Sequence, residues 1–190
     1  MNEPTQGFLV GKKVKLVAPN EEQDAVTLSN WTRDSEYWRL CLAEPARFRY
    51  PAGQIKWIKE AKQNGYLFMI KTQPQDVIIG QIEISEINRT SANGWLSISI
   101  GDREYWGKKY GVEAIQLMMD FGFTTLNLHR ISLTVFSYNG RAIKAYQKVG
   151  FKMEGSEKEA LWRDGKRWDI IYMGILKGEW QDIIKVRNNL

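Results

Sequence analysis

The sequence predicts an α/β (α+β) fold in which a mixed sheet of about seven strands carries helices on both faces. Segments rich in alternating or β-branched residues recur along the chain and are separated by segments with helical periodicity. Turn-like connections in the middle predict antiparallel hairpins, whereas a strand–helix–strand order in the second half predicts parallel pairing. No internal repeat or proline-rich linker divides the 190 residues, so we expect one domain over residues 1–190.

The first half of the chain is predicted to contain a strand, three helices and then two further strands. Lysines alternate with apolar residues over Lys12–Val17, which indicates the first strand. Asn20 is followed by acidic residues and caps a helix that reaches Trp31. The other elements expected here are a short helix, a helix that begins at a proline, and two strands joined by a turn: Ser35–Leu42, a helix from Pro51 with Ile55, Ile58 and Ala61 as its apolar stripe, Tyr66–Lys71 and Val77–Ile87.

The second half is predicted to alternate strands with long helices. The strand Trp95–Ile100 follows Asn93–Gly94, a dipeptide typical of hairpin turns. A helix over about Lys109–Leu126 has apolar residues around most of its circumference, so we expect it to be packed within the protein. The remaining elements are a strand, a capped helix that ends at a glycine, and two strands: Arg130–Phe136, Asn139 to Gly150, and the stretch through about Leu176.

The composition is that of a globular protein. Hydrophobic residues make up 43% of the chain and charged residues 26%, a balance that excludes a disordered chain or a fibre. The formal net charge of +5 favours anionic partners such as nucleic acid, a membrane surface or a phosphorylated cofactor. The basic residues are dispersed and form no stripe with interleaved aromatic residues, which disfavours nucleic acid. No apolar run approaches the ~20 residues that cross a bilayer, so no membrane partner is expected.

Cys41 and His129 are the only residues of their types. They exclude an internal disulfide and any zinc site built from several Cys or His ligands, so no metal is expected. We interpret Cys41 as a small buried residue and His129 as a packing and hydrogen-bonding group instead of a base. The segment Met1–Phe8 lacks a basic region followed by an apolar stretch, which predicts a cytoplasmic protein without a secretory signal.

A glycine-containing segment between a strand and the long helix is the strongest candidate for chemistry. Gly107 and Gly111 allow a tight turn at the start of that helix, where free backbone N–H groups and the helix dipole favour phosphate. Lys108 and Lys109 add positive charge beside this turn. The alternative interpretation is a flexible loop that only caps the helix, and a glycine pair alone does not distinguish the two.

Three ordered motifs together carry a family resemblance. They are Tyr-Trp-Gly-Lys-Lys-Tyr-Gly-Val-Glu-Ala at 105–114, Leu-Asn-Leu-His-Arg at 126–130, and Asn-Gly-Arg-Ala-Ile-Lys-Ala-Tyr-Gln-Lys-Val-Gly-Phe at 139–151. In this order the chain resembles the Gcn5-related N-acetyltransferase (GNAT) superfamily, and within it the ribosomal-protein/spermidine N-acetyltransferase type. The segments 163–169 and 174–180 are also similar to that subgroup. The resemblance covers about residues 10–185.

The resemblance implies a GNAT-like domain with a V-shaped opening between its central strands and acetyl-CoA as co-substrate, without a metal. The family's pyrophosphate signature falls on Trp106–Gly111, where Trp106 replaces a Gln or Arg and Lys109 replaces a glycine. Lys109 can still offer its N–H if its backbone angles stay helical. The cofactor-binding residues that we assign are Ile98, Ile100, Trp106, Gly107, Lys108, Lys109, Tyr110, Gly111, Asn139 and Lys144.

The resemblance also implies direct transfer of the acetyl group to a primary amine in a ternary complex, with Tyr146 as the proton donor. Tyr146 follows Asn139 by seven residues, two helical turns, so both face the same side. A phenol with a pKa near ~10 suits protonation of a leaving thiolate. The alternative is that Tyr146 only packs with Ala142 and Val149 on a buried stripe.

The base is harder to assign, because Trp95 stands where many members of the subgroup carry a Glu. Alternation along the strands puts Gln81, Glu83 and Ser85 on one face, and Trp95, Ser97 and Ser99 on one face of the next strand. Two matched polar faces indicate a water-filled cleft in which Glu83 deprotonates the amine through ordered water. The alternative is a solvated Glu83 on an exposed face.

The sequence leaves the acceptor open. A small amine and a protein N-terminal amine both fit, and a homodimer is implied only by the family. The resemblance also implies that the first helical region, with its aromatic residues, covers the acceptor groove. A catalytically silent acyl-CoA-binding protein of the same fold is the alternative function, because Trp95 and Lys109 depart from the family pattern.

Overall fold

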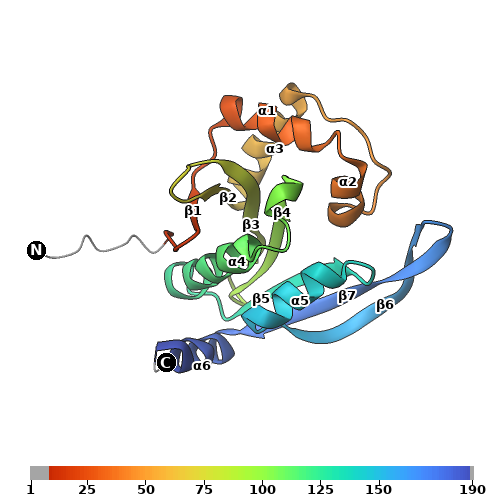
Figure 1. Cartoon of the computed structure of the whole chain (residues 1–190). Coiled ribbons are helices and arrows are strands. Elements are labelled where there is room, and N and C mark those ends of the chain that lie inside the picture. The colour runs from red at the N-terminus through yellow and green to blue at the C-terminus, as the bar shows by residue number, and fades with distance from the viewer. Residues whose placement is uncertain (1–8, 189–190) are drawn as a thin grey trace, which may run out of the picture.

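The structure is a computed structural model that describes residues 9–188, so the segment Met1–Phe8 considered above lies outside the described residues. The predicted order of elements is confirmed, with one helix added at the end (Figure 1). The strands are β1 (Val14–Val17), β2 (Gly65–Thr72), β3 (Ile78–Asn88), β4 (Asn93–Ile100), β5 (Arg130–Phe136), β6 (Lys152–Arg163) and β7 (Lys166–Leu176). The α-helices are α1 (Glu21–Trp31), α2 (Ser35–Cys41), α3 (Pro51–Asn64), α4 (Tyr110–Asp120), α5 (Gly140–Val149) and α6 (Lys177–Asn188).

The strands form one mixed sheet in the order β1-β2-β3-β4-β5-β7-β6, which confirms the predicted sheet of about seven strands. Only β4 and β5 pair in parallel, and every other neighbouring pair is antiparallel. The parallel pair is the place where α4 carries the chain from one strand to the next. The sheet therefore consists of an N-terminal antiparallel half and a C-terminal antiparallel half that meet at β4 and β5.

The β3–β4 hairpin is confirmed, but the turn does not use the Asn93–Gly94 dipeptide that predicted it. Both residues lie inside β4, and the chain reverses one step earlier, with Ala92 at a φ of 52°. Gly94 is required for close packing, because a Cβ there would approach the Ile84 side chain to 2.9 Å and that of Leu128 to 3.1 Å. The sequence therefore predicted the hairpin correctly, but Gly94 is required by close packing and not by the turn.

Local signals set the helix ends where the sequence predicted them. The Asn20 side chain accepts a hydrogen bond from the Gln23 amide at the start of α1, and Gly150 ends α5 at a φ of 122°. The long central helix continues beyond α4 as a π-helical turn over Phe121–Thr125. Helix α6 was not predicted, although its Trp180 is buried beside Phe123.

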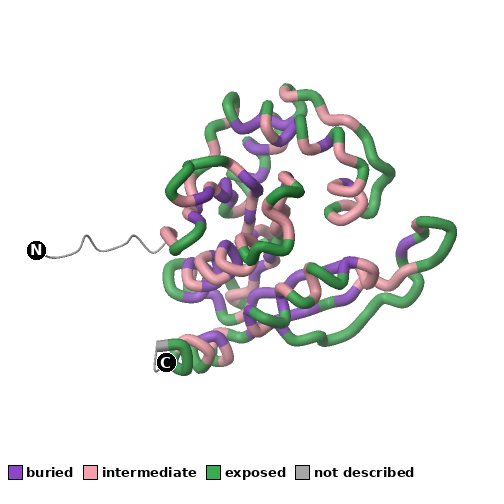
Figure 2. Tube along the Cα trace, viewed as in Figure 1, coloured by how far each residue is buried: buried purple, intermediate pink, exposed green. Residues whose placement is uncertain are grey.

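Two hydrophobic clusters lie on opposite faces of the sheet. The larger one joins α4 and α5 to the sheet, and the smaller one lies beneath α1 and α3. Alternation along β2 divides its side chains between them, since Leu67 and Met69 enter the smaller cluster and Phe68 and Ile70 the larger. Figure 2 shows buried residues concentrated in the central strands, whereas most of β6 is exposed.

The two halves of the sheet separate beyond the first residues of β4 and β5. These strands are paired only from Asn93 to Trp95 on β4 and from Arg130 to Ser132 on β5. Beyond Trp95 the two strands diverge, and the edge of β4 that faces β5 has no strand partner. This confirms the V-shaped opening implied by the family resemblance.

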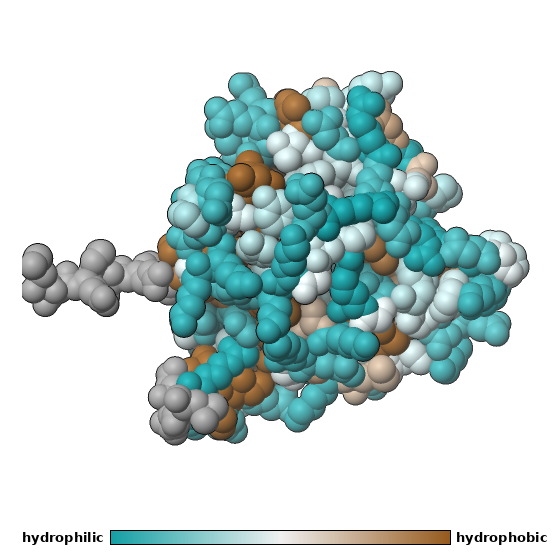
Figure 3. Space-filling model, in the orientation of Figure 1, coloured by the Kyte–Doolittle hydropathy of each residue, from teal (hydrophilic) through white to brown (hydrophobic). Residues whose placement is uncertain are grey.

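Within residues 9–188, no helix is long and apolar enough to cross a membrane, and no group of three or more His, Cys, Asp or Glu residues could hold a metal ion. Figure 3 shows one face of the molecule, on which hydrophilic residues dominate and hydrophobic residues reach the surface in small separate areas.

Candidate active site

A cavity of 590 Å³ opens where β4 and β5 diverge and extends between α2 and the N-terminal ends of α4 and α5. Of the twelve residues that the sequence assigns to catalysis and cofactor binding, eleven line this one cavity. They are Glu83, Ile98, Ile100, Trp106, Gly107, Lys109, Tyr110, Gly111, Asn139, Lys144 and Tyr146. The exception is Lys108, which does not line the cavity and whose carbonyl accepts a hydrogen bond from the Lys13 ammonium at 3.2 Å.

The unpaired edge of β4 forms one wall of the cavity. Gly101 donates its N–H to the Ile79 carbonyl at 2.9 Å, so the backbone groups of alternate residues point toward β3. Those of Ile98 and Ile100 point the other way, toward the opening. The Ile100 carbonyl is occupied there by the Trp106 indole N–H at 2.7 Å, which leaves Ile98 with the unpartnered donor and acceptor of a strand edge.

The start of α4 lies at the far end of that wall. Lys109 is the N-cap of α4 with a φ of 71°, in the left-handed region, and not helical as the sequence argument required. The cause is the turn itself, since Gly107 at a φ of 72° and Lys109 together redirect the chain from the loop into the helix. The first amides of an α-helix have no intrahelical partner, and in α4 no side-chain cap takes its place.

Space in front of this helix end is preserved by Gly111. A Cβ there would meet only Ile100 at 3.7 Å and Ile98 at 3.9 Å, the two residues of the β4 wall. The loop before the helix is held by Trp106, whose ring lies 3.8 Å from the Arg141 guanidinium and whose N–H bonds to β4. Arg141 is a cavity residue that the sequence analysis did not identify, although it follows the Asn139 cap by two positions.

Tyr146 belongs to both the core and the cavity. Its ring packs against Phe151 with centroids 5.9 Å apart, and only 8% of the residue is exposed. Burial raises the pKa of its hydroxyl well above the ordinary value, so the phenol stays protonated at neutral pH. The hydroxyl makes no hydrogen bond to any other described residue, and the side chain lines the cavity. The packing alternative and the catalytic one are therefore compatible.

The polar faces of β3 and β4 are in register, as alternation along the strands predicted. Glu83 lies opposite Ser97, and Gln81 lies opposite Ser99. Burial raises the pKa of Glu83, the one acidic side chain among the described residues that line the cavity. Gln81 Oε1 is buried and has no hydrogen-bond partner within the described chain. This face forms the floor of a groove beneath α1, α2 and α3.

Two sequence interpretations need revision in this groove. Cys41 is not a packing residue of the core: it is exposed at the end of α2 and lines the cavity, although burial of its sulfur raises the pKa of the thiol to about 12. His129 is exposed and does not line the cavity, which agrees with excluding it as the base, but its side chain does not pack in the core. Its backbone N–H bonds to the Ala92 carbonyl at 2.6 Å.

The groove also contains Tyr37, Arg49 and Gln54, to which the sequence analysis gave no role. The Tyr37 hydroxyl lies 3.1 Å from Ser99 Oγ, and burial raises its pKa strongly. Gln54 is 5% exposed in the first turn of α3. A signal for it existed, because Gln54 precedes Ile58 by four residues and so occupies the buried stripe of that helix. The sequence contained no comparable signal for Arg49.

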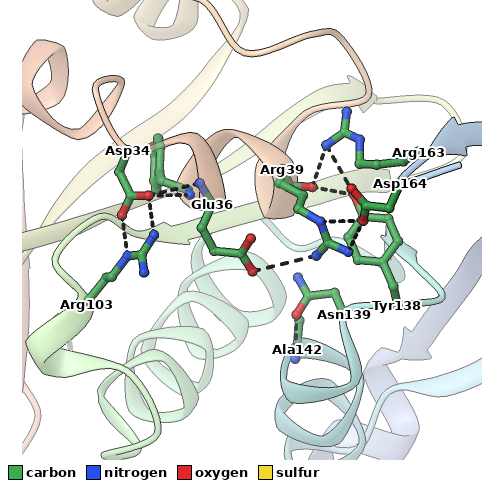
Figure 4. Close-up of polar contacts among 10 residues, drawn as sticks. Asp34, Glu36, Arg39, Arg103, Tyr138, Asn139, Ala142, Arg163 and Asp164 are labelled. Carbon is green, nitrogen blue, oxygen red and sulfur yellow. Dashed lines mark hydrogen bonds and ion pairs between the residues drawn. The ribbon is translucent and has the colours of Figure 1, made fainter.

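Helix α2 crosses the cavity and is fixed at both ends (Figure 4). At its start, the N-cap Asp34 forms an ion pair with Arg103, and this interaction holds the pKa of Asp34 below its ordinary value. At its end, Arg39 forms an ion pair with Asp164 at 2.6 Å. Arg163 donates to the carbonyl groups of Arg39, Leu42, Ala43 and Glu44.

These residues fit acetyl-CoA. The free edge of β4 offers backbone donors and acceptors to an extended amide-containing chain, and the uncapped start of α4 offers amide N–H groups to phosphate. The open space at Gly111 allows phosphate to approach the helix, while Lys109 and Lys144 supply positive charge around the same cavity. Tyr146 lines the cavity within its buried wall, where its hydroxyl is free to act on a bound thioester.

Comparison with known proteins identifies the family. The acetyltransferase (GNAT) domain family matches residues 13–152. The chain belongs to the GNAT acetyltransferase family. An uncharacterized N-acetyltransferase of Bacillus licheniformis is 31% identical over 163 residues, which cover 84% of this chain and 91% of that protein. This GNAT chain is an N-acetyltransferase with acetyl-CoA as its co-substrate.

Two spermidine acetyltransferases are similar to this GNAT enzyme. The spermidine N(1)-acetyltransferase of Escherichia coli is 36% identical over 101 residues, or 53% of this chain and 54% of that protein. The crystal structure of spermidine N-acetyltransferase from Vibrio cholerae, in complex with CoA and spermine, superposes with a TM-score of 0.79 at 25% identity. That match covers 88% of this chain and 98% of the Vibrio chain.

Proposed function

We propose that this enzyme transfers an acetyl group from acetyl-CoA to a primary amine by direct attack within a ternary complex. The observation that carries the proposal is the convergence of the open β4 edge, the uncapped start of α4 and the Tyr146 side chain on one cavity. Bound acetyl-CoA supplies the activated acetyl thioester. All other requirements, which are binding, orientation and proton transfer, fall to residues of this chain.

Binding and orientation rest mainly on backbone groups. The amides of the first turn of α4 bind the pyrophosphate, and the free edge of β4 at Ile98 binds the pantetheine arm. Trp106 keeps the loop in place through its bond to the Ile100 carbonyl and its contact with Arg141. Asn139 caps α5 through its side-chain oxygen, which fixes the start of the helix that carries Tyr146.

Tyr146 protonates the sulfur of the departing CoA. Its raised pKa keeps the hydroxyl protonated over the whole neutral range, and its lack of a protein partner leaves that proton available. A general acid of this kind contributes ~10²–10⁴-fold to the rate.

Glu83 accepts the proton of the attacking amine through water. Its position opposite Ser97 lies on the polar floor just beyond the point where β4 leaves β5. Burial raises its pKa, which makes it a stronger base than an ordinary carboxylate. The neighbouring serines and Gln81 supply polar groups that order water in the groove.

The finer features of the enzyme are proposals as well. We assign it to the ribosomal-protein/spermidine N-acetyltransferase type, on the motifs at 105–114 and 139–151 together with its spermidine acetyltransferase relatives. The acceptor is a small amine or a protein N-terminal amine. We further propose that residues 1–190 act as one N-acetyltransferase domain in the cytoplasm and that the enzyme forms a homodimer.

The proposal is tested by two measurements on the intact protein. Acetyl-CoA and CoA should raise the melting temperature, because a ligand that binds only the folded state stabilises it by mass action. Incubation with acetyl-CoA and a panel of amines and peptides should give acetylated products that mass spectrometry detects. A protein that is not stabilised by millimolar CoA, or that acetylates nothing in the panel, would contradict the proposal.

A further inference from the structure

The half of the cavity beneath α1, α2 and α3, here called the acceptor half, contains several polar side chains without a hydrogen-bond partner in the described chain. The inference about what they bind rests on the proposed function above. We propose that the acceptor is a primary amine that also carries an anionic group, and that Arg49 binds this group while Gln54 and Gln81 complete the subsite. The chemistry is that of an amino acid or a phosphorylated amine, and not that of a polyamine.

The acceptor half offers little to a polycation. Within the described chain, its charged lining residues are Arg49 and Glu83. A polyamine bears several positive charges, each of which needs a carboxylate or water when it leaves bulk solvent. A single carboxylate that also serves as the base does not meet that need. The other basic residues of the cavity lie at the start of α4 and along α5, in the half assigned to CoA: Lys109, Arg141, Lys144 and Lys148.

Arg49 is placed in the acceptor half by contacts of its own backbone. Its N–H donates to Thr32 Oγ1 at 3.0 Å, and its carbonyl accepts from Ser29 Oγ at 2.8 Å. Its guanidinium lies 5.1 Å from the Trp38 ring centroid. It forms no ion pair within residues 9–188, although a guanidinium is suited to bind carboxylate or phosphate through two parallel hydrogen bonds.

Arg49 and Tyr37 line the same cavity as Gln81 and Glu83 on the floor of the groove. The Tyr37 hydroxyl bonds to Ser99, which pairs with Gln81 across the sheet. The positive charge of Arg49 opposes the larger rise that burial causes in the pKa of Tyr37, which agrees with this arrangement. Glu83 follows Gln81 by two residues, a separation of ~7 Å along a strand. One small molecule can therefore reach both the base and Arg49.

Two amide side chains support the same conclusion independently. Gln81 Oε1 is fully buried and has no partner within the described chain. Gln54 is 5% exposed and lines the cavity, and its side-chain amide, which is not fully buried, makes no hydrogen bond to the described residues. Buried polar groups in folded proteins are rarely left unpaired. The amide N–H groups can donate to an anion, and Gln81 Oε1 can accept from an ammonium group.

The experiment compares amines in matched pairs that differ only by the anionic group. The pairs are phenylalanine and phenethylamine, 4-aminobutyrate and butylamine, and phosphoethanolamine and ethanolamine, with spermidine as the polycation. We measure kcat/KM by mass spectrometry of the acetylated product. In at least one pair the anionic member should be preferred by about tenfold or more, the usual effect of a hydrogen bond to a charged group. The pairs also distinguish a carboxylate from a phosphate.

Variants then test whether Arg49 is the cause of the preference. Arg49→Met keeps the aliphatic stem and removes the charge, so it should remove the preference through KM, while CoA-induced stabilisation is retained. Arg49→Lys should restore part of it. The matched control is Arg47→Met, since Arg47 is exposed, pairs with Glu44 and does not line the cavity. This control should keep the preference of the parent enzyme.

The failures of the two proposals are distinguishable. Acetylation of neutral amines or spermidine in preference to every anionic partner overturns the acceptor inference and leaves the proposed function standing. An equal loss of activity toward all amines in Arg49→Met, with loss of CoA stabilisation, also overturns it, because the residue would then be structural. No product from any amine, together with no stabilisation by CoA, overturns the proposed function itself.

Discussion

The cavity has two halves that are built in different ways. The half formed by β4 and the start of α4 presents backbone N–H and C=O groups, which strand divergence and the absence of a side-chain cap leave free. The half beneath α1, α2 and α3 presents side chains, among them Arg49, Gln54 and Glu83. Each half is open to the same space, and the acetyl group must pass from one to the other.

The difference explains why the backbone half was predictable from the sequence, whereas in the side-chain half only the strand residues Gln81 and Glu83 were predicted. A backbone site depends on turn geometry and on small residues, so Gly107 and Gly111 leave a recognisable pattern. A side-chain site depends on which residues three separate helices bring together, and any polar residue type can serve. The backbone half therefore indicates which reaction is catalysed, whereas the side-chain half determines which acceptor is bound.

The largest effect should come from Tyr146→Phe, which removes the proposed proton donor and keeps the ring. We expect turnover to fall by ~10²–10⁴-fold with CoA-induced stabilisation unchanged. Because burial raises the pKa of Tyr146, the parent should show no loss of rate from its ionisation at or below pH 10. Steady-state rates and thermal shifts check both expectations.

A control for this variant is Tyr172→Phe, on the exposed side of β7, whose hydroxyl contacts Glu157 outside the cavity. It should keep full turnover. Equal turnover in Tyr146→Phe and the parent would show that Tyr146 only packs in the core and is not the proton donor.

Gly111→Asp should prevent CoA binding in the backbone half and leave the side-chain half unchanged. The substitution puts bulk and negative charge at the mouth of α4, so the melting-temperature increase with CoA should disappear, a stabilisation of ~2.7 kcal/mol at 100-fold excess over Kd. Gly178→Asp is the matched control, because Gly178 is likewise the second residue of a helix and lies away from the cavity. Retention of the full CoA shift in Gly111→Asp would refute the pyrophosphate assignment.

Glu83→Gln tests whether the side-chain half supplies the base, because the effect of the substitution should depend on pH. We expect a loss of about tenfold at neutral pH that shrinks as pH rises toward the pKa of the acceptor, where free amine is abundant. Burial raises the pKa of Glu83, so the parent should lose rate as pH falls through a pKa above the ordinary 4.5. The variant should lack that limb of the profile.

Glu60→Gln serves as the control, because Glu60 is an exposed carboxylate on α3 that pairs with Lys56, does not line the cavity and does not act on the pKa of Glu83; it should leave the profile unchanged. If Glu83→Gln and the parent gave superimposable pH–rate curves, the enzyme would use the neutral fraction of the amine and Glu83 would not be the base.

The smallest effect concerns α2, which joins the two halves. Asp34→Asn keeps a good N-cap and removes the charge opposite Arg103, so unfolding free energy should fall by ~0–1 kcal/mol. Asp34→Ala also removes the cap and should cost ~1 kcal/mol more. Urea unfolding measures both.

The Asp34 ion pair also has a defined pH dependence. Because Arg103 lowers the pKa of Asp34 in the folded protein, this stabilisation is present above the unfolded pKa of ~3.9 and is lost as pH falls through the lower folded value. Equal stability of the parent and Asp34→Asn at all pH values would show that the pair contributes nothing.

The fold was predictable because local and periodic signals agreed. Capping residues such as Asn20 and Asn139 set helix starts, and alternation put Gln81 and Glu83 on the face where the structure has them. Gly94 was misread because close packing and tight turns both select glycine, and the sequence does not separate the two causes. Helix α6 was missed because its short apolar stripe gains its stability from packing against the sheet.

The position of the site in the fold was predictable, but its backbone conformation and several of its side chains were not. The motif led to the correct turn, yet Lys109 adopts a left-handed conformation that its residue type does not suggest. Arg49 lies in an irregular segment between α2 and α3, where neither periodicity nor capping marks it. Its place depends on Ser29 and Thr32 of another helix, contacts that only the folded chain reveals. The assigned roles of Tyr146 and Glu83 stay predictions.

The two-ended attachment of α2 has a consequence for how the protein folds. Its bonds join Asp34 to Arg103 and Arg39 to Asp164, across 69 and 125 residues of chain. Contacts so distant in sequence carry a large loop-closure cost and form late. During synthesis the contacts of Arg39 with Asp164 cannot form until the β6–β7 hairpin has emerged, so the C-terminal end of α2 is fixed over the cavity among the last steps of folding.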